Sequence, residues 1–136
     1  MLPISADNLL IALRAAGEPT RLRILALLAE GERSVKDLTD ILGQSQPRIS
    51  RHLKLLVEAG LVRRNAEGAW AFFRLADSGA AAEVSRNIVA RLDRSDPALV
   101  RDRGRLEAVR RAHAESVKAH FSEPAGQWDL IRSLHP

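Results

Sequence analysis

One short segment, residues 44–56 (QSQPRISRHLKLL), combines the leucine spacing of a helix with several basic and hydrogen-bonding side chains. When residues are placed at 100° intervals, four apolar side chains fall on one face: Ile49, Leu53, Leu56 and Val57. Three basic side chains point away from that face together: Arg48, Arg51 and Lys54. Such groups bind phosphates and guanine edges, so this face predicts a contact with nucleic acid.

The positive charge of the chain is concentrated around the same segment. Between Ser45 and Arg64 there are five basic residues and one acidic residue, so this stretch carries the whole formal net charge of +4. A basic excess confined to one segment is the electrostatic footprint of nucleic-acid binding. A basic face that only contacts solvent remains the alternative.

Composition indicates one globular domain with an appendage. The 136 residues are 46% hydrophobic and 28% charged. No apolar run approaches the roughly 20 residues of a membrane span. The amino-terminal segment lacks the basic region of a signal peptide, so we expect a cytoplasmic protein. The absence of cysteine excludes disulfides, thiolate metal sites and cysteine nucleophiles in these residues.

Apolar periodicity predicts two helices at the start of the chain. The first, from Ser5 to Ala16, has apolar residues on more than one side, which suits a helix shared with a second subunit. The second has Pro19 in its first turn and ends at Gly31. Its expected buried side consists of Leu22, Leu25, Ala26 and Ala29.

A third, shorter helix precedes the basic one. Ser34 and Asp37 resemble a capping box, and Gly43 ends the helix. Its buried side is expected to be Leu38, Ile41 and Leu42. Only two or three residues then remain before the basic helix, which we expect to be capped near Ser45 with Pro47 in its first turn. Two short helices joined by so tight a turn predict a helix-turn-helix arrangement.

After the basic helix the pattern changes to that of a β-hairpin. Residues 61–64 and 69–76 favour strands, and residues 65–68 (NAEG) favour a turn. Arg63 and Arg64 are expected at the neck of this turn, where a wing reaches the phosphate backbone. Three aromatic residues are expected to pack against the helices, with base stacking as the alternative: Trp70, Phe72 and Phe73.

The order helix, helix, tight turn, helix, hairpin is that of a winged helix-turn-helix. Residues 5–78 resemble the ArsR/SmtB family of bacterial transcriptional repressors through the motifs EPTRLRIL, SQPRISRHLKLL, AGLVRR and GAWAFFRL. The resemblance implies a mainly α fold with a small β-hairpin and a dimeric arrangement. It also implies a homodimeric repressor that binds imperfect inverted repeats in double-stranded operator DNA. Such repressors are released when a small effector, often a metal ion, binds.

In that setting the candidate DNA-binding residues divide into two kinds of contact. Gln46 can bond an adenine edge, and Arg48 or Arg51 can bond a guanine edge. The serines, Lys54 and the wing arginines suit phosphates, which position the protein without reading sequence. His52 either touches DNA or supports the helix. The full candidate set is Ser45, Gln46, Arg48, Ser50, Arg51, His52, Lys54, Arg63 and Arg64.

Beyond residue 78 we expect two further helices. We divide the chain into a DNA-binding domain (1–78), a dimerisation helix with a long carboxy-terminal helix (79–122) and a tail (123–136). The expected dimer interface consists of Leu10, Leu13, Val84, Ile88 and Leu92. The long helix is expected to run from Ala98 to about Phe121. Its seam at heptad spacing is Leu99, Leu106, His113 and His120, with Val109 and Val117 beside it.

Two histidines in that seam raise the question of a metal. His113 and His120 lie on one face, and Glu123 could add an oxygen ligand for zinc or nickel in a metal-responsive repressor. The ligand spacing of metal-sensing relatives is not reproduced, however, because no Asp-x-His precedes the pair. A polar seam at the solvent edge is therefore the favoured interpretation, and no cofactor is predicted.

The tail FSEPAGQWDLIRSLHP resembles the junction to an S-adenosylmethionine-dependent methyltransferase in ArsR–methyltransferase fusion proteins. Three functions stay open: a repressor acting alone, the DNA-binding half of such a fusion, and a protein-interaction module. The basic helix favours the first two. S-adenosylmethionine or S-adenosylhomocysteine is a candidate effector. These residues contain no catalytic pair or cofactor loop, so the chain is predicted not to be an enzyme.

Overall fold

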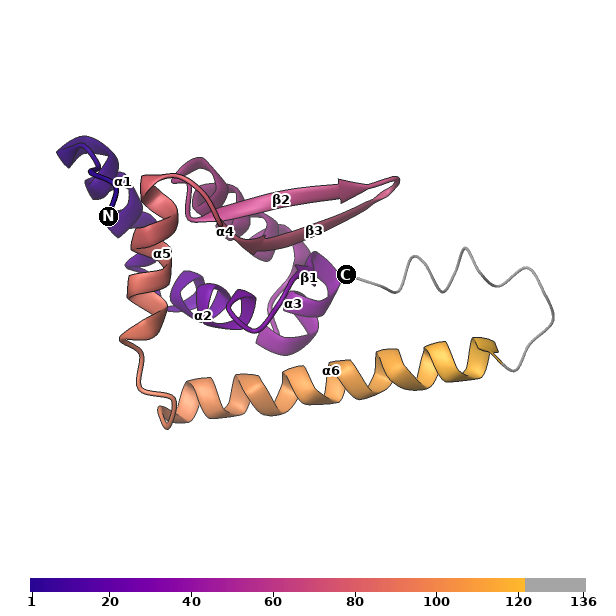
Figure 1. The fold of residues 1–136 in the computed structure, drawn as a ribbon. Helices are drawn as coiled ribbons and strands as arrows, with labels where there is room; N and C mark the ends of the chain where they lie inside the picture. The colour runs from indigo at the N-terminus through magenta and orange to yellow at the C-terminus, as the bar shows by residue number, and fades with distance from the viewer. Residues whose placement is uncertain (122–136) are drawn as a thin grey trace.

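The computed structural model describes residues 1–121, which form helices and a small sheet (Figure 1). The helices are α1 Ala6–Ala16, α2 Pro19–Leu28, α3 Val35–Leu42, α4 Gln46–Glu58, α5 Ala80–Ala90 and α6 Pro97–Phe121. The strands are β1 Arg33–Ser34, β2 Val62–Glu67 and β3 Trp70–Leu75. This is the mainly helical, winged helix-turn-helix architecture that the sequence predicted, including the long carboxy-terminal helix.

Serine side chains begin three of the predicted helices. The hydroxyl oxygens of Ser5, Ser34 and Ser45 accept hydrogen bonds from the backbone N–H three residues later. These bonds satisfy donors that lack a partner within the first helical turn. Helix α3 ends at Gly43, whose φ of 66° lies in the left-handed region that favours glycine. The sharp turn before α4 follows from that backbone conformation.

The wing contains one strand more than the sequence predicted. The sheet is antiparallel in the order β1-β3-β2, and the two residues of β1 pair with Phe73 and Phe72 of β3. A two-residue strand is too short to show the alternation by which strands are recognised. Strand β1 ties the loop after α2 to the hairpin, so the wing is fixed to the helices on that edge.

The hairpin turn is shorter than expected. Glu67 pairs with Trp70, so the loop consists of Gly68 and Ala69, and the prediction of a turn over residues 65–68 is wrong. Gly68 has a φ of 59° at the first loop position, where two-residue hairpins favour glycine. Strand β2 therefore continues through the segment that polar composition had assigned to the turn.

The aromatic residues of β3 differ in their burial. Phe72 and Phe73 are 6% and 7% exposed, so their predicted packing is confirmed. Trp70 is 50% exposed, and the same prediction is wrong for it. The register gives the reason, because Trp70 lies next to the hairpin loop, past the end of β1, where the hairpin extends away from the helices (Figure 1).

Helix α2 is surrounded by other elements, and its buried side was only partly predicted. Leu25 is buried as expected, but Leu22 and Ala26 are half-buried and Ala29 is exposed. The remaining buried apolar residues of the helix are Ile24, Leu27 and Leu28. Because α2 packs against α1, α4, α5 and α6, no single apolar stripe can describe it.

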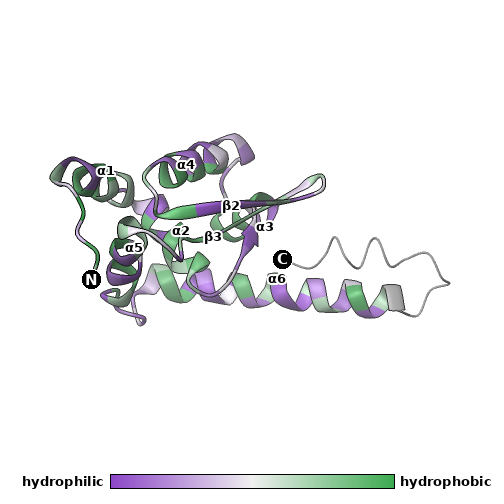
Figure 2. Cartoon of the chain, turned by 45° about the horizontal axis from the view of Figure 1, so that its top comes forward, coloured by the Kyte–Doolittle hydropathy of each residue, from purple (hydrophilic) through white to green (hydrophobic). Residues whose placement is uncertain are grey.

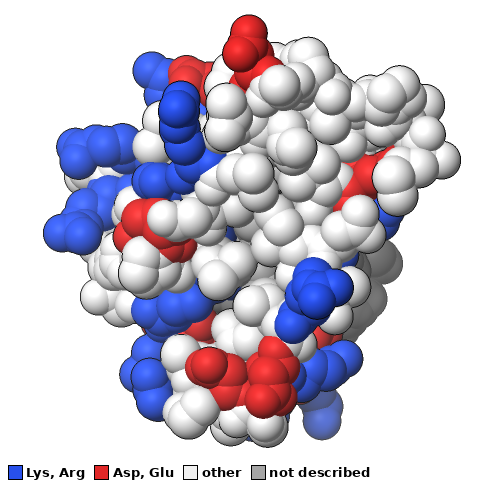
Figure 3. All heavy atoms as spheres, turned by 90° about the vertical axis from the view of Figure 1, so that its left-hand side faces the viewer, with Lys and Arg blue, Asp and Glu red and all other residues white. Residues whose placement is uncertain are grey.

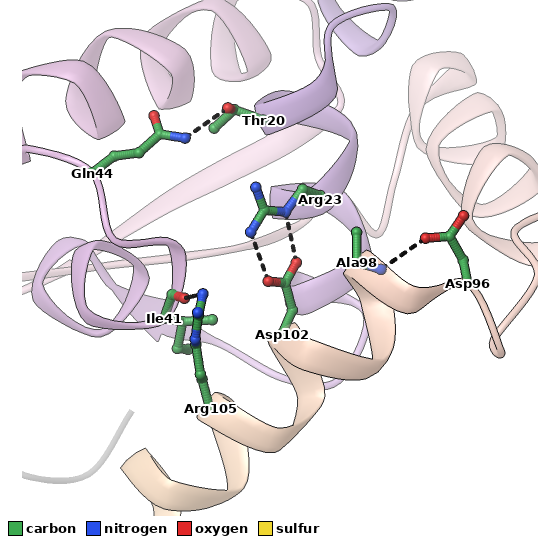
Figure 4. A network of polar contacts seen from close by, with 8 residues as sticks. All are labelled: Thr20, Arg23, Ile41, Gln44, Asp96, Ala98, Asp102 and Arg105. Carbon is green, nitrogen blue, oxygen red and sulfur yellow. Dashed lines mark hydrogen bonds and ion pairs between the residues drawn. The ribbon is translucent and has the colours of Figure 1, made fainter.

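Helix α6 runs along the opposite side of the molecule from α4 and packs against α2 and α3 (Figures 1 and 2). The predicted seam is confirmed at Leu99 and Leu106, which are 8% and 1% exposed, and Val109 beside it packs against the core. His113 and Val117, farther along the seam, are only half-buried. Two arginines of α6 also bond to backbone carbonyls of the bundle. Arg105 donates to Ile41 O at 3.2 Å (Figure 4). Arg110 donates to Glu30 O at 3.1 Å.

A buried ion pair joins α6 to α2. Asp102 is 1% exposed, and its carboxylate oxygens accept hydrogen bonds from Arg23 Nε at 2.8 Å and Nη2 at 2.7 Å (Figure 4). This bond and the smaller attraction of the carboxylate raise the pKa of Arg23, against the lowering effect of burial.

In residues 1–121 no helix is both long and apolar enough to cross a membrane.

Candidate nucleic-acid interface

Helix α4 presents the two faces that its sequence predicted. Ile49, Leu53 and Leu56 are 0%, 1% and 0% exposed, so its inner face belongs to the core. The basic side chains on the outer face are all exposed: Arg48, Arg51 and Lys54. Lys54 lies 4.0 Å from Glu58 one turn later, a contact between two exposed groups that contributes little stability. These cations are free to contact a charged partner.

The amino-terminal end of α4 is open to solvent. Ser45 and Gln46 are exposed, and Ser45 Oγ accepts from the Arg48 N–H at 3.4 Å. Gln46 Nε2 donates to Ser50 Oγ at 3.3 Å, an exposed bond that water or a base edge can replace. The amino-terminal end of α4 therefore presents an amide, two hydroxyl groups and the positive end of the helix dipole. This arrangement suits entry into the major groove of DNA.

The turn before α4 is held by a contact that the sequence did not reveal. Gln44 Nε2 donates to Thr20 Oγ1 at 2.8 Å, which ties the turn to the first turn of α2 (Figure 4). Thr20 is buried, at 6% exposed. Because this bond fixes the position at which α4 begins, Gln44 is a positioning residue for the basic face.

His52 lies apart from the other candidates. Its side chain is 14% exposed, with Nδ1 3.2 Å from Arg21 Nη1 and 3.8 Å from Glu18 Oε2. Burial lowers its pKa, Glu18 opposes that shift, and nearby arginines of α2 and α4 lower the pKa further. A neutral ring can accept the Arg21 hydrogen bond through Nδ1. This geometry favours the second of the two predicted roles, support of α4.

The lowered pKa of His52 predicts a loss of stability in acid. The folded state disfavours the charged ring, so stability falls as the pH drops below the ordinary histidine pKa of about 6.5. His52→Asn keeps an acceptor for Arg21 without titrating. We expect the Tm of the wild-type protein to fall more than that of the variant between about pH 7.5 and 5.5, as measured by calorimetry. Equal falls would contradict the assignment.

The wing arginines lie at the base of the hairpin, so the prediction of a position at the neck of the turn is wrong. Arg63 pairs with Arg74 and Arg64 with Phe73, five and four residues before the loop begins at Gly68. Arg63 Nη2 donates to Ser78 Oγ at 2.7 Å, and its Nε lies 3.6 Å from an Asp77 oxygen. Asp77 also bonds Arg74, so its negative charge is shared between two arginines. The charge of Arg63 is therefore only partly neutralised.

Arg64 lies beside α4. It lines a hollow of about 520 Å³ together with the apolar Leu53 and Phe73, the polar Ser50 and Lys54, and the acidic Glu58 beside Lys54. The structure thus brings a β2 cation and two α4 side chains to one concave surface. Their arrangement suits a phosphate of DNA lying between the helix and the wing.

The proposed metal ligands are only partly described. His113 Nε2 lies 3.2 Å from Asp37 Oδ1, so the carboxylate of Asp37 in the first turn of α3 contacts α6. Within the described residues, no group of three or more histidine and carboxylate side chains could hold a metal ion. The side chain of His120, the candidate Glu123 and the tail that resembles a methyltransferase junction lie outside the described residues.

An uncharged surface lies on the side of α1 and α5 (Figure 3). Leu10, Ile11 and Leu13 of α1 are 47%, 48% and 47% exposed, which is unusual for large apolar residues on one helix. Val84 and Ile88 of α5 are half-buried. Leu92, expected on the same helix, lies beyond its last residue, Ala90. Two of the five predicted interface residues, Leu10 and Leu13, thus offer an apolar face.

Comparison with known proteins agrees with this geometry. Residues 18–64, from the start of α2 into β2, match the family described as "Bacterial regulatory protein, arsR family". The HTH-type transcriptional regulator MJ1325 of Methanocaldococcus jannaschii is 48% identical over 65 residues, which are 47% of this chain and 73% of that protein. The chain belongs to the ArsR family.

Two further comparisons extend this result. The arsenical resistance operon repressor of Escherichia coli is 46% identical over 76 residues, which are 55% of this chain and 60% of that protein. The homodimeric winged helix-turn-helix DNA-binding domain of Mb0332 from Mycobacterium bovis has 28% identity and a TM-score of 0.55, covering 66% of this chain and 88% of that one. The shared part is the winged helix-turn-helix of an ArsR-family transcriptional regulator, and the match spans less than two thirds of the Escherichia coli repressor.

Proposed function

We propose that this ArsR-family protein is a homodimeric repressor that binds an inverted-repeat operator and is released by a small effector. The observation that carries the proposal is the outer face of α4, where Arg48, Arg51 and Lys54 are exposed together while the inner face is buried. A binding function of this kind needs no catalytic group.

Selection of duplexes from random-sequence DNA by the 136-residue protein tests the proposal. We expect inverted repeats whose half-sites lie about one helical turn, roughly 34–36 Å, apart, because two-fold related recognition helices enter successive major grooves. Recovery of no common sequence after repeated rounds would contradict sequence-specific binding. Recovery of single half-sites would contradict the dimeric mode alone.

The dimer is expected to form through α1. Replacing Leu10 and Leu13 with glutamate places charges in the apolar surface, and we expect the protein to become monomeric at low micromolar concentration in sedimentation experiments. Val100→Glu is the matched control, because Val100 is 47% exposed on α6 and lies away from α1. A wild-type monomer, or a dimer that survives both glutamates, would show that α1 is not the interface.

The class of effector differs from that of a thiol-based sensor. With no cysteine among its 136 residues, this chain cannot offer thiolates to arsenite or cadmium. The resemblance to the Escherichia coli arsenical repressor therefore supports the fold and the DNA-binding mode and does not support arsenic sensing. A metal response through His113 and His120 remains a second proposal, resting on their spacing alone.

A further inference from the structure

A cavity lies on the opposite side of α2 from the DNA-binding helix. It has a volume of about 360 Å³ and is bounded by α2, the end of α5, the α5–α6 connection and the first turns of α6. Its walls include the apolar side chains of Leu27, Val89, Leu92 and Leu99. At roughly 30 Å³ for a water-sized group, the cavity has room for about 12 non-hydrogen atoms.

The charges around this cavity do not balance. Asp102 is neutralised by its two bonds from Arg23, and Glu30 lies 3.5 Å from Arg94. Arg103 donates to the backbone carbonyl oxygen of Arg94 at 2.6 Å. Among the described residues, no carboxylate lies within ion-pair distance of Arg103. One half-buried guanidinium is therefore left without a counter-ion at a cavity whose lining is both apolar and charged.

We propose that this cavity binds a small carboxylic acid with an apolar body. The body would lie against the leucines and Val89, and the carboxylate would pair with Arg103, whose planar guanidinium suits bidentate recognition. An anion is favoured over a cation because Arg23, from outside the lining, pairs with Asp102 and Arg94 lies beside Glu30, which leaves the charge of Arg103 unpaired. A neutral apolar molecule would leave that charge without a partner in a less hydrated site.

The cavity lies where a bound ligand can influence the DNA-binding helix through the helices between them. This step rests on the proposed function. Helix α5 packs against α1, which carries the apolar dimer surface. Helix α2 contacts α4 through Arg21 and His52. A ligand that joins the end of α5 to α2 and α6 can therefore bias how α1 and α4 are held. An effector changes affinity only through its different binding to two such arrangements.

Calorimetric titration of the 136-residue protein without DNA tests the binding step. The probes are benzoate, octanoate and indole-3-acetate, with indole-3-acetamide and tryptamine as neutral and cationic matches for the last. We expect at least one carboxylate to bind with a Kd below about 1 mM. We also expect each neutral or cationic match to bind at least about 10-fold more weakly, because it cannot pair with Arg103.

Two variants link that binding to the cavity. Arg103→Gln should weaken binding at least about 10-fold, whereas Arg101→Gln, which removes an exposed arginine on the same helix outside the cavity, should leave it unchanged. The proposal is overturned if none of the carboxylates binds at about 5 mM, if acid and amide bind equally, or if Arg103→Gln binds as the wild-type protein does.

The regulatory step is measured separately on a selected DNA duplex. Saturating carboxylate should change DNA affinity about 5- to 150-fold in the wild-type protein and not in Arg103→Gln. DNA binding without ligand tests the proposed function, and titration without DNA tests the cavity, so the two failures are distinguishable. An acid that binds the cavity and leaves DNA affinity unchanged would overturn the regulatory step.

Discussion

Replacing Arg48 and Arg51 together with glutamine is expected to lower the affinity for a selected DNA duplex by at least about 100-fold. Both guanidinium groups are exposed on the outer face of α4. A good bidentate pair with a guanine edge contributes about 1–3 kcal/mol of discrimination, and a dimer loses each pair twice. Fluorescence anisotropy with a labelled duplex at fixed salt measures the change.

The salt dependence of the same titration separates base contacts from phosphate contacts. With 6–10 phosphate contacts, wild-type affinity should fall by about 10³–10⁵ between 50 and 200 mM salt. Lys54→Gln should weaken binding to all sequences similarly and reduce the slope of log affinity against log salt by about 1 per contact removed. Binding that ignores salt would contradict a phosphate interface.

Arg101 and Arg111 provide the matched control. Both are exposed on α6, on the opposite side of the molecule from α4, and their double replacement with glutamine removes the same charge (Figure 1). We expect this variant to stay within a few-fold of the wild-type affinity. An equal loss in both double variants would mean that net charge alone governs binding, and an unchanged affinity in the α4 variant would exclude its outer face.

The recognition helix could be predicted because its signals are local. The Ser45 cap and the 100° spacing of Ile49, Leu53 and Leu56 fix both the start and the rotation of α4, which in turn fix where Arg48 and Arg51 point. The positions of the wing arginines could not be read in this way. Their distance from the loop depends on the strand register. The polar composition of residues 65–68 predicted a loop that begins three residues too early.

The features that the sequence did not reveal are those that depend on distant partners. Strand β1 exists only because Arg33 and Ser34 meet β3. Gln44 positions α4 through Thr20, twenty-four residues earlier in the chain. The exposure of Trp70 depends on where β1 ends. In each case the type of residue was evident, and the tertiary contact decided what it does.

Asp102 is the clearest case, and it carries the second large effect. It lies between Leu99 and Leu106 on the seam of α6, where the heptad pattern predicts an apolar residue. Asp102→Ala should destabilise the protein by about 2–3 kcal/mol. That is below the usual cost of breaking a fully buried pair, because Arg23 is 25% exposed and can recover part of its hydration.

Thermal unfolding at one fixed protein concentration measures this loss, since the Tm of a dimer depends on concentration. We expect the Tm of Asp102→Ala to be lower by about 10 °C. Replacing Asp102 with leucine and Arg23 with methionine together should restore most of the stability, because the double variant leaves no unpaired charge against α2. If the single and double variants lose the same stability, packing of the seam and not the charge pair holds α6 in place. A Tm unchanged by Asp102→Ala would show that the position of α6 does not depend on this contact.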